Sequence, residues 1–223
     1  MPSRLEQSEP AIRKVFNKLN LSFRKQFQLL IKQPWRELQK QIELYARSLK
    51  QENGQLAVDS ISEQLLSNTS FVLAAYRILT PLANDRDRIL VCLQKVMGSL
   101  ISENIEGYLM SRIGITQEEP QKAFDTACKN FKKKGEEQMG RSFIYEQEVA
   151  QRSLCVVNIR KCFFNDFFKT NCSAEITTVY CAGDNIWMEE LNKPKYFVSV
   201  ERTKTLAEGK DACDFRFSKV RKS

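Results

Sequence analysis

The apolar residues in the first 140 positions are spaced like those of amphipathic helices. One stripe steps by three and four residues: Trp35, Leu38, Ile42, Tyr45 and Leu49. A capping-box pattern that begins at Ser60 predicts a second helix, which we expect to end at Thr80 and Pro81. Asn84 or Asp85 can cap a third helix, and residues 120–134 predict a fourth. Such stripes are more typical of core packing than of cofactor sites.

Beyond Gly140 the pattern changes to the alternation that is typical of half-buried strands. The alternating or β-rich stretches are 141–150, 154–159, 196–203 and 212–220, and a helical stripe returns over 175–191. Helices followed by strands predict an α+β fold, in which a helical N-terminal half packs on an antiparallel sheet of three to four strands with intervening helices. We divide the chain into a basic helical N-terminal arm (1–53), a helical segment (54–140) and a Cys-rich α+β segment (141–223). We expect 54–223 to fold as one unit.

Positive charge is concentrated at the N-terminus. The net charge is +8, and residues 1–53 carry eleven Lys and Arg against five Glu. A basic arm can bind an acidic partner, nucleic acid or an anionic membrane surface, although a solvated helix face explains the same pattern. No apolar run is long enough to form a transmembrane segment, and the first ten residues do not resemble a secretory signal. We therefore expect a cytoplasmic protein of unknown oligomeric state.

The chain contains no histidine and seven cysteines. Without histidine, Ser–His and Cys–His nucleophile pairs and His metal ligands are excluded. An odd number of cysteines with no export signal argues against a complete disulfide framework, and no pair has the tight spacing that is typical of zinc or iron–sulfur sites. Cys162, Cys181 and Cys213 can still form a spatial site for a divalent metal such as zinc or manganese. The alternative is that these thiols are small buried side chains.

One face of the predicted helix 175–191 combines a thiol with a carboxylate. Ile176, Tyr180 and Trp187 belong to its packing stripe, and Cys181 and Asp184 lie one turn apart on the neighbouring stripe. A thiol and a carboxylate beside an apolar seam form a plausible site element, although the same pairing is also common by chance.

The last two predicted strands form a hairpin around Gly209 and carry two arginines. Arg202 and Arg216 are each suited to bind a carboxylate bidentately. A structural cross-strand salt bridge, for example with Glu201 or Asp214, is the alternative, and spacing alone favours it. The hairpin therefore offers candidate substrate-binding residues without deciding between the two interpretations.

Four sequence elements follow one another in the last third of the chain. They are Arg160-Lys-Cys162-Phe, Cys181-Ala-Gly-Asp184, Arg202-Thr-Lys-Thr-Leu-Ala-Glu-Gly209 and Cys213-Asp-Phe-Arg-Phe217. In their order and approximate spacing these elements resemble the L-2-amino-thiazoline-4-carboxylic acid hydrolase family. The resemblance implies a hydrolase that opens the thiazoline ring of a carboxylate-bearing substrate to N-carbamoyl-L-cysteine.

Residue chemistry assigns roles for such a reaction. Water must attack an amidine-like carbon, so a base is needed, and Asp184 is the candidate. Arg202 or Arg216 is the candidate to bind the substrate carboxylate, and Thr203 or Thr205 can donate hydrogen bonds. The candidate metal ligands are Cys162, Cys181 and Cys213. Cys181 and Cys213 are also candidate catalytic thiols. Two other functions stay open: a non-catalytic sensor module that binds a ligand, a metal, an iron–sulfur cluster or a tetrapyrrole, and a basic interaction or scaffold protein.

Overall fold

The computed structural model describes residues 21, 23–27, 31 and 33–220. Its helices are α2 (Trp35–Glu52), α3 (Ser60–Ala83), α4 (Arg86–Ser102), α5 (Ile105–Arg112), α6 (Ala123–Met139), α7 (Phe163–Thr170) and α8 (Thr177–Leu191). Its strands are β1 (Ile144–Ala150), β2 (Leu154–Lys161), β3 (Val198–Arg202) and β4 (Cys213–Lys219). Residues 1–20 of the predicted basic arm lie outside the described residues. None of the described helices is long and apolar enough to cross a membrane.

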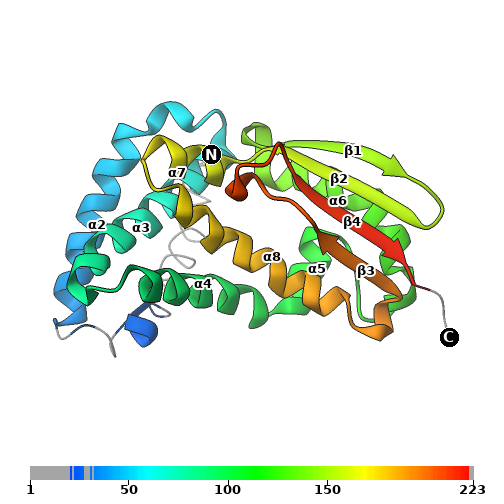
Figure 1. The fold of residues 1–223 in the computed structure, drawn as a ribbon, viewed down its shortest axis with the longest axis horizontal. Coiled ribbons are helices and arrows are strands. Elements are labelled where there is room, and N and C mark those ends of the chain that lie inside the picture. The colour runs from blue at the N-terminus through cyan, green and yellow to red at the C-terminus, as the bar shows by residue number, and fades with distance from the viewer. Residues whose placement is uncertain (1–20, 22, 28–30, 32, 221–223) are drawn as a thin grey trace, which may run out of the picture.

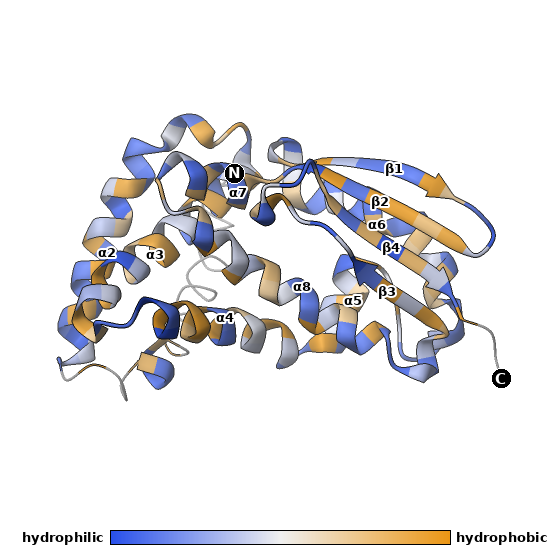
Figure 2. Ribbon diagram, viewed as in Figure 1, coloured by the Kyte–Doolittle hydropathy of each residue, from blue (hydrophilic) through white to orange (hydrophobic). Residues whose placement is uncertain are grey.

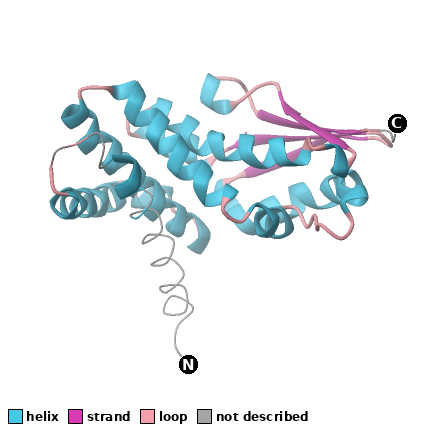
Figure 3. Ribbon diagram, turned by 90° about the horizontal axis from the view of Figure 1, so that it is seen from below, coloured by secondary structure: helices cyan, strands magenta, loops and turns pink. Residues whose placement is uncertain are grey.

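The four strands form one antiparallel sheet in the order β1-β2-β4-β3. Helices α2, α3 and α4 lie at the other end of the molecule, and α8 runs from that end to the sheet (Figure 1). Turning the molecule shows the same separation of the sheet from the helical end (Figure 3). The predicted α+β fold is therefore confirmed, with a sheet of four strands. The predicted hairpin is also present, because Arg202 on β3 pairs with Phe215 on β4.

One hydrophobic core joins the sheet to the helices. The ring of Phe131 on α6 lies 5.1 Å from Phe215 and 5.1 Å from Phe217 on β4, and 5.7 Å from Trp187 on α8. All four side chains are buried, and each contributes roughly 1.5–3 kcal/mol by leaving water. Apolar and hydrophilic residues follow one another along these helices and strands (Figure 2). This core fixes α8 against the sheet, which determines where the side chains of α8 point.

Helix α2 packs against α3 rather than standing apart. The apolar stripe predicted from its spacing is the face that packs: Leu38, Ile42 and Leu49 are buried, whereas Trp35 and Tyr45 are half-buried. Phe23 is also fully buried, and its ring meets that of Phe71 on α3 edge-on at 5.4 Å. The described part of the predicted arm therefore shares the common core.

Several helix ends differ from those predicted. Asp59, not Ser60, caps α3: its carboxylate accepts a hydrogen bond from the Ser62 backbone N–H, and the Ser62 hydroxyl accepts one from the Asp59 backbone N–H. The helix also continues through Pro81, because a missing N–H so near the end costs a single hydrogen bond. Asn84, in the left-handed conformation with φ 49°, ends it. Of the two residues predicted to cap α4, Asn84 and Asp85, it is Asp85 that does so.

Two short helices, α5 and α7, are absent from the sequence-based prediction, and α6 extends past the predicted end at residue 134 to Met139. Gly140 then turns the chain with φ 64° toward β1. A side chain there would collide with Asp59, whose carboxylate accepts a hydrogen bond from the Arg141 backbone at 2.7 Å. The glycine thereby allows the start of the sheet to approach the start of α3.

Candidate functional site

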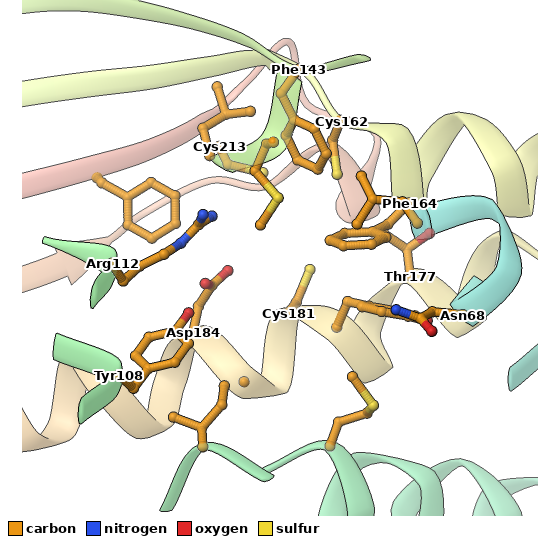
Figure 4. Close-up of a pocket in the computed structure, with 18 of the residues that line it drawn as sticks. Asn68, Tyr108, Arg112, Phe143, Cys162, Phe164, Thr177, Cys181, Asp184 and Cys213 are labelled. Carbon is orange, nitrogen blue, oxygen red and sulfur yellow. The ribbon is translucent and has the colours of Figure 1, made fainter. Parts of the chain in front are cut away.

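A cavity of about 270 Å³ lies between α8, the sheet and the neighbouring helices. Its walls come from all the helices α3 to α8 and from the inner faces of β1, β2 and β4. This volume is close to the lower end of the roughly 300–1,000 Å³ that is usual for small-molecule sites. Most of the lining is apolar, and Figure 4 shows the polar and sulfur-bearing side chains that interrupt it. The cavity is therefore suited in size and lining to a small organic molecule.

One face of α8 supplies the polar floor of this cavity. Thr177, Cys181 and Asp184 are spaced by four and three residues, so their side chains lie in one row along the helix. All three line the cavity, as Figure 4 shows. The predicted pairing of Cys181 with Asp184 on one face is therefore present, and that face is open to the cavity.

Two side chains outside the cavity lining donate hydrogen bonds to the Asp184 carboxylate. Trp187 Nε1 donates to its Oδ1 at 3.0 Å, and Arg202 Nη1 donates to its Oδ2 at 2.7 Å. The Arg202 side chain is only 8 % exposed, whereas that of Asp184 is 32 % exposed. Arg202 also stands over the Phe215 ring, 5.5 Å from its centroid. The ion pair fixes the orientation of the carboxylate, which faces the cavity.

Arg112 on α5 points into the same cavity and was not among the predicted site residues (Figure 4). Its guanidinium donates to Gln138 Oε1 at 3.0 Å and to the Tyr145 hydroxyl at 3.5 Å. Burial on its own would lower the pKa of Arg112, but nearby Tyr145, Tyr108 and Asp184 keep that pKa above its ordinary value. Within the described part of the chain, no carboxylate forms an ion pair with this arginine. The cavity therefore contains a cation without a direct anionic partner.

Two tyrosines complete the wall around Arg112. Burial raises the pKa of Tyr108 to about 12, and it also raises the pKa of Tyr145. Both phenols are therefore neutral hydrogen-bonding groups at physiological pH. Tyr145 packs so closely on α6 that a side chain at Gly135 would lie 2.6 Å from its ring. The glycine thus determines how near the ring can come to the helix.

Cys162, Cys181 and Cys213 all line the cavity. Burial raises the pKa of each thiol, and for Cys181 it raises it to about 12, so all three are protonated at neutral pH. The Leu206 backbone N–H also donates to Cys213 Sγ at 3.2 Å. Among the described residues, no three Cys, Asp or Glu side chains are placed to hold a metal ion together. The predicted zinc or manganese ligands thus share a wall without forming a ligand set.

A family model for L-2-amino-thiazoline-4-carboxylic acid hydrolase matches residues 68–217. The chain belongs to this family. The match begins within α3 and ends in β4, so it contains every residue that lines the cavity except Leu65. The match therefore extends well beyond the last third of the chain, which contains the four sequence elements that resemble the family. No curated protein and no solved structure matches the chain.

In this hydrolase-family member, both arginines predicted to bind a carboxylate lie outside the cavity lining. Arg202 is occupied by Asp184, as described above, and also donates to Asn185 Oδ1 at 3.2 Å. Arg216 lies on the opposite face of β4 from Phe215, and its Nε is 3.5 Å from a Glu201 carboxylate oxygen. Side chains alternate between the two faces of a strand, so Arg216 is directed away from the core. Its contact is the cross-strand salt bridge considered as the alternative.

The two predicted threonine donors also lie outside the lining and have structural partners. Thr203 donates from its backbone N–H and its hydroxyl to the buried Asp214 carboxylate, at 2.8 and 2.6 Å. Thr205 caps a short 3₁₀ helix by accepting from the Glu208 backbone N–H at 3.2 Å. The threonines of the Arg-Thr-x-Thr element therefore stabilise the turn between β3 and β4.

Proposed function

We propose that the protein hydrolyses a small, carboxylate-bearing heterocycle in this cavity. Arg112 binds the carboxylate, and Asp184 orients the attacking water. The observation that carries the proposal is a desolvated guanidinium with no ion-pairing carboxylate, in the same cavity as a fixed carboxylate. Arg112 forms hydrogen bonds with Gln138 and Tyr145 but no ion pair within the described residues, so its guanidinium can still bind a ligand carboxylate. This assignment replaces Arg202 and Arg216 with Arg112 as the carboxylate-binding residue.

The reaction named for the family suits these groups. In L-2-amino-thiazoline-4-carboxylic acid the oxygen of water bonds to ring C2, and the C2–S bond breaks. The sulfur leaves as a thiol and the ring nitrogen takes the second proton, which gives N-carbamoyl-L-cysteine. Asp184 accepts a proton from the water and returns it to the leaving group. Because burial raises the pKa of Cys181 and of Cys213, their neutral thiols are poor nucleophiles, and water is the attacking group.

A test of this proposal is ring opening of L-2-amino-thiazoline-4-carboxylic acid, followed by chromatography of N-carbamoyl-L-cysteine. Asp184→Asn keeps the hydrogen-bonding shape and removes the base, so we expect turnover to fall roughly 10²–10⁴-fold. Asp211→Asn is the matched control, because Asp211 is an exposed loop residue that binds Lys204 outside the cavity. No ring opening by the unaltered protein, or equal rates for Asp184→Asn and the unaltered protein, would contradict the proposal.

One observation favours a non-catalytic binding module as the second candidate. Both Asp184 oxygens already accept a hydrogen bond, from Trp187 and from Arg202, which leaves fewer lone pairs free to accept a proton from water. Such a module would bind the thiazoline carboxylate through Arg112 and leave it intact. Calorimetric binding by the unaltered protein without any product would therefore support the module over the hydrolase.

A further inference from the structure

Three residues that line the cavity on the side away from Arg112 each carry a buried polar atom without a partner among the described residues. The atoms are Asn68 Oδ1, Thr177 Oγ1 and the Tyr180 hydroxyl. Thr177 is only 2 % exposed, and the three atoms themselves are buried. More than nine in ten buried polar groups in proteins are hydrogen-bonded, so an unpartnered polar atom in a cavity wall is a candidate for a ligand contact. In the described part of the chain, Ser70, Thr80, Asn158 and Asn165 also carry unpartnered atoms, but they lie outside the lining.

These atoms lie far from the charged end of the cavity. Thr177 precedes Asp184 by two turns of α8, which is about 10 Å along the helix axis. In Figure 4, Asn68 and Thr177 lie on the side opposite Arg112 and Asp184, with Cys181 between them. Arg112 and Asp184 are also the two charged side chains in the described lining. The far end therefore offers hydrogen bonds without charge.

The wall at the far end is rigid and apolar around its polar atoms. The Tyr180 ring stacks on Phe164, with 4.0 Å between centroids and 18° between planes, which fixes the direction of the hydroxyl. Met97 and Leu100 of α4 line the same cavity. An apolar, sulfur-lined middle separates this end of the cavity from Arg112.

We propose that Asn68, Thr177 and Tyr180 form a second subsite, which binds an uncharged hydrogen-bonding group of the ligand, such as a carboxamide, a carbamoyl group or a hydroxyl. The natural ligand is then an elongated monoanion with a carboxylate at one end, an apolar middle and a neutral polar group at the other end. A bare thiazoline carboxylate occupies only the Arg112 end. The carboxylate end rests on the proposed function; the neutral subsite rests on its own three residues.

The test uses monoamides of linear dicarboxylic acids of increasing chain length, compared with methyl-ended acids of the same length. We expect calorimetric affinity for the monoamides to peak at one length, where it exceeds that of the methyl-ended acid at least tenfold. Thr177→Val should abolish this preference, and Tyr180→Phe should weaken it. Thr178→Val is the matched control, because the Thr178 hydroxyl donates to the Glu175 carbonyl at 2.7 Å and lies outside the lining.

Each outcome decides the proposal. Equal affinity for amide-ended and methyl-ended acids at every length would overturn it, since the polar atoms would then hold water only. Loss of the preference in Thr178→Val but not in Thr177→Val would also overturn it. If no acid binds, the carboxylate site of the proposed function fails, and uncharged diamides then test the second subsite alone. A diamide preference that disappears in Thr177→Val supports the subsite, and its absence refutes it.

Discussion

Arg202→Met should remove the ion pair that orients the Asp184 carboxylate. The Arg202–Asp184 contact is 2.7 Å long, and Coulomb's law with an effective dielectric of about 20 gives roughly 6 kcal/mol at that distance. The cost of desolvating Arg202 and the 32 % exposure of Asp184 reduce this to about 2 kcal/mol of net coupling. Methionine keeps the apolar stem that packs on Phe215, so the loss reports on the charge.

Urea unfolding of the unaltered protein, Arg202→Met, Asp184→Asn and the double variant measures that coupling as a double-mutant cycle. Trp187 fluorescence is a suitable signal, because its indole donates to Asp184. Arg216→Met is the control: its pair with Glu201 is exposed and should cost less than about 1 kcal/mol. Additive effects of Arg202→Met and Asp184→Asn would refute the reasoning. In turnover assays, Arg202→Met should lower kcat and leave KM nearly unchanged, because Arg112 binds the substrate separately.

Three further outcomes follow from the structure. Peptide mass maps after iodoacetamide treatment at pH 8 should show the exposed Cys172 modified first and the cavity thiols spared. Burial raises the pKa of the cavity thiols and so lowers their thiolate fraction. Rapid modification of the cavity thiols would contradict this expectation. Asp214→Ala should lower the free energy of unfolding by about 2–3 kcal/mol, since it leaves the backbone and hydroxyl of Thr203 unpaired, and an unchanged urea midpoint would contradict it. Gly135→Ala should weaken ligand binding in calorimetry despite the better helix propensity of alanine, because the new methyl group displaces Tyr145; unchanged affinity would show that the ring can move freely.

The parts of the fold that could be predicted are those with a regular apolar period. The stripe of α2 and the alternation of β3 correspond to the buried faces in the structure, whereas β2 is buried on both faces. Helices α5 and α7 could not be predicted in this way, because each spans only eight residues. Leu109 is the only buried residue of α5, so the helix has no repeating apolar positions that would distinguish its sequence from that of a loop.

Helical spacing predicts the part of the candidate site that lies on one element. Cys181 and Asp184 lie one turn apart on α8, so helical spacing alone brings them together. Arg112 has no such signal, because the chain brings α5 to the cavity through tertiary packing. The inward direction of Arg202 follows from strand alternation, but its partner Asp184 lies on a helix that no local pattern relates to β3.

For the three cavity thiols, burial distinguishes between the roles that sequence spacing alone allows. The sequence permits Cys162, Cys181 and Cys213 as ligands or nucleophiles, and the structure does bring all three to one cavity. Their burial raises the pKa of each thiol, and their placement gives no ligand set within the described residues. The environment of a side chain, rather than its identity, therefore determines which role is supported.

The most direct test of carboxylate recognition by Arg112 is calorimetric affinity for L-2-amino-thiazoline-4-carboxylic acid and for its primary carboxamide, in the unaltered protein and in Arg112→Met. Removing one partner of a desolvated charge pair costs about 3 kcal/mol, or roughly a hundredfold in Kd. We predict that the unaltered protein prefers the carboxylate by about that factor and that Arg112→Met binds both molecules equally weakly. A preference for the carboxylate that survives in Arg112→Met would contradict the account.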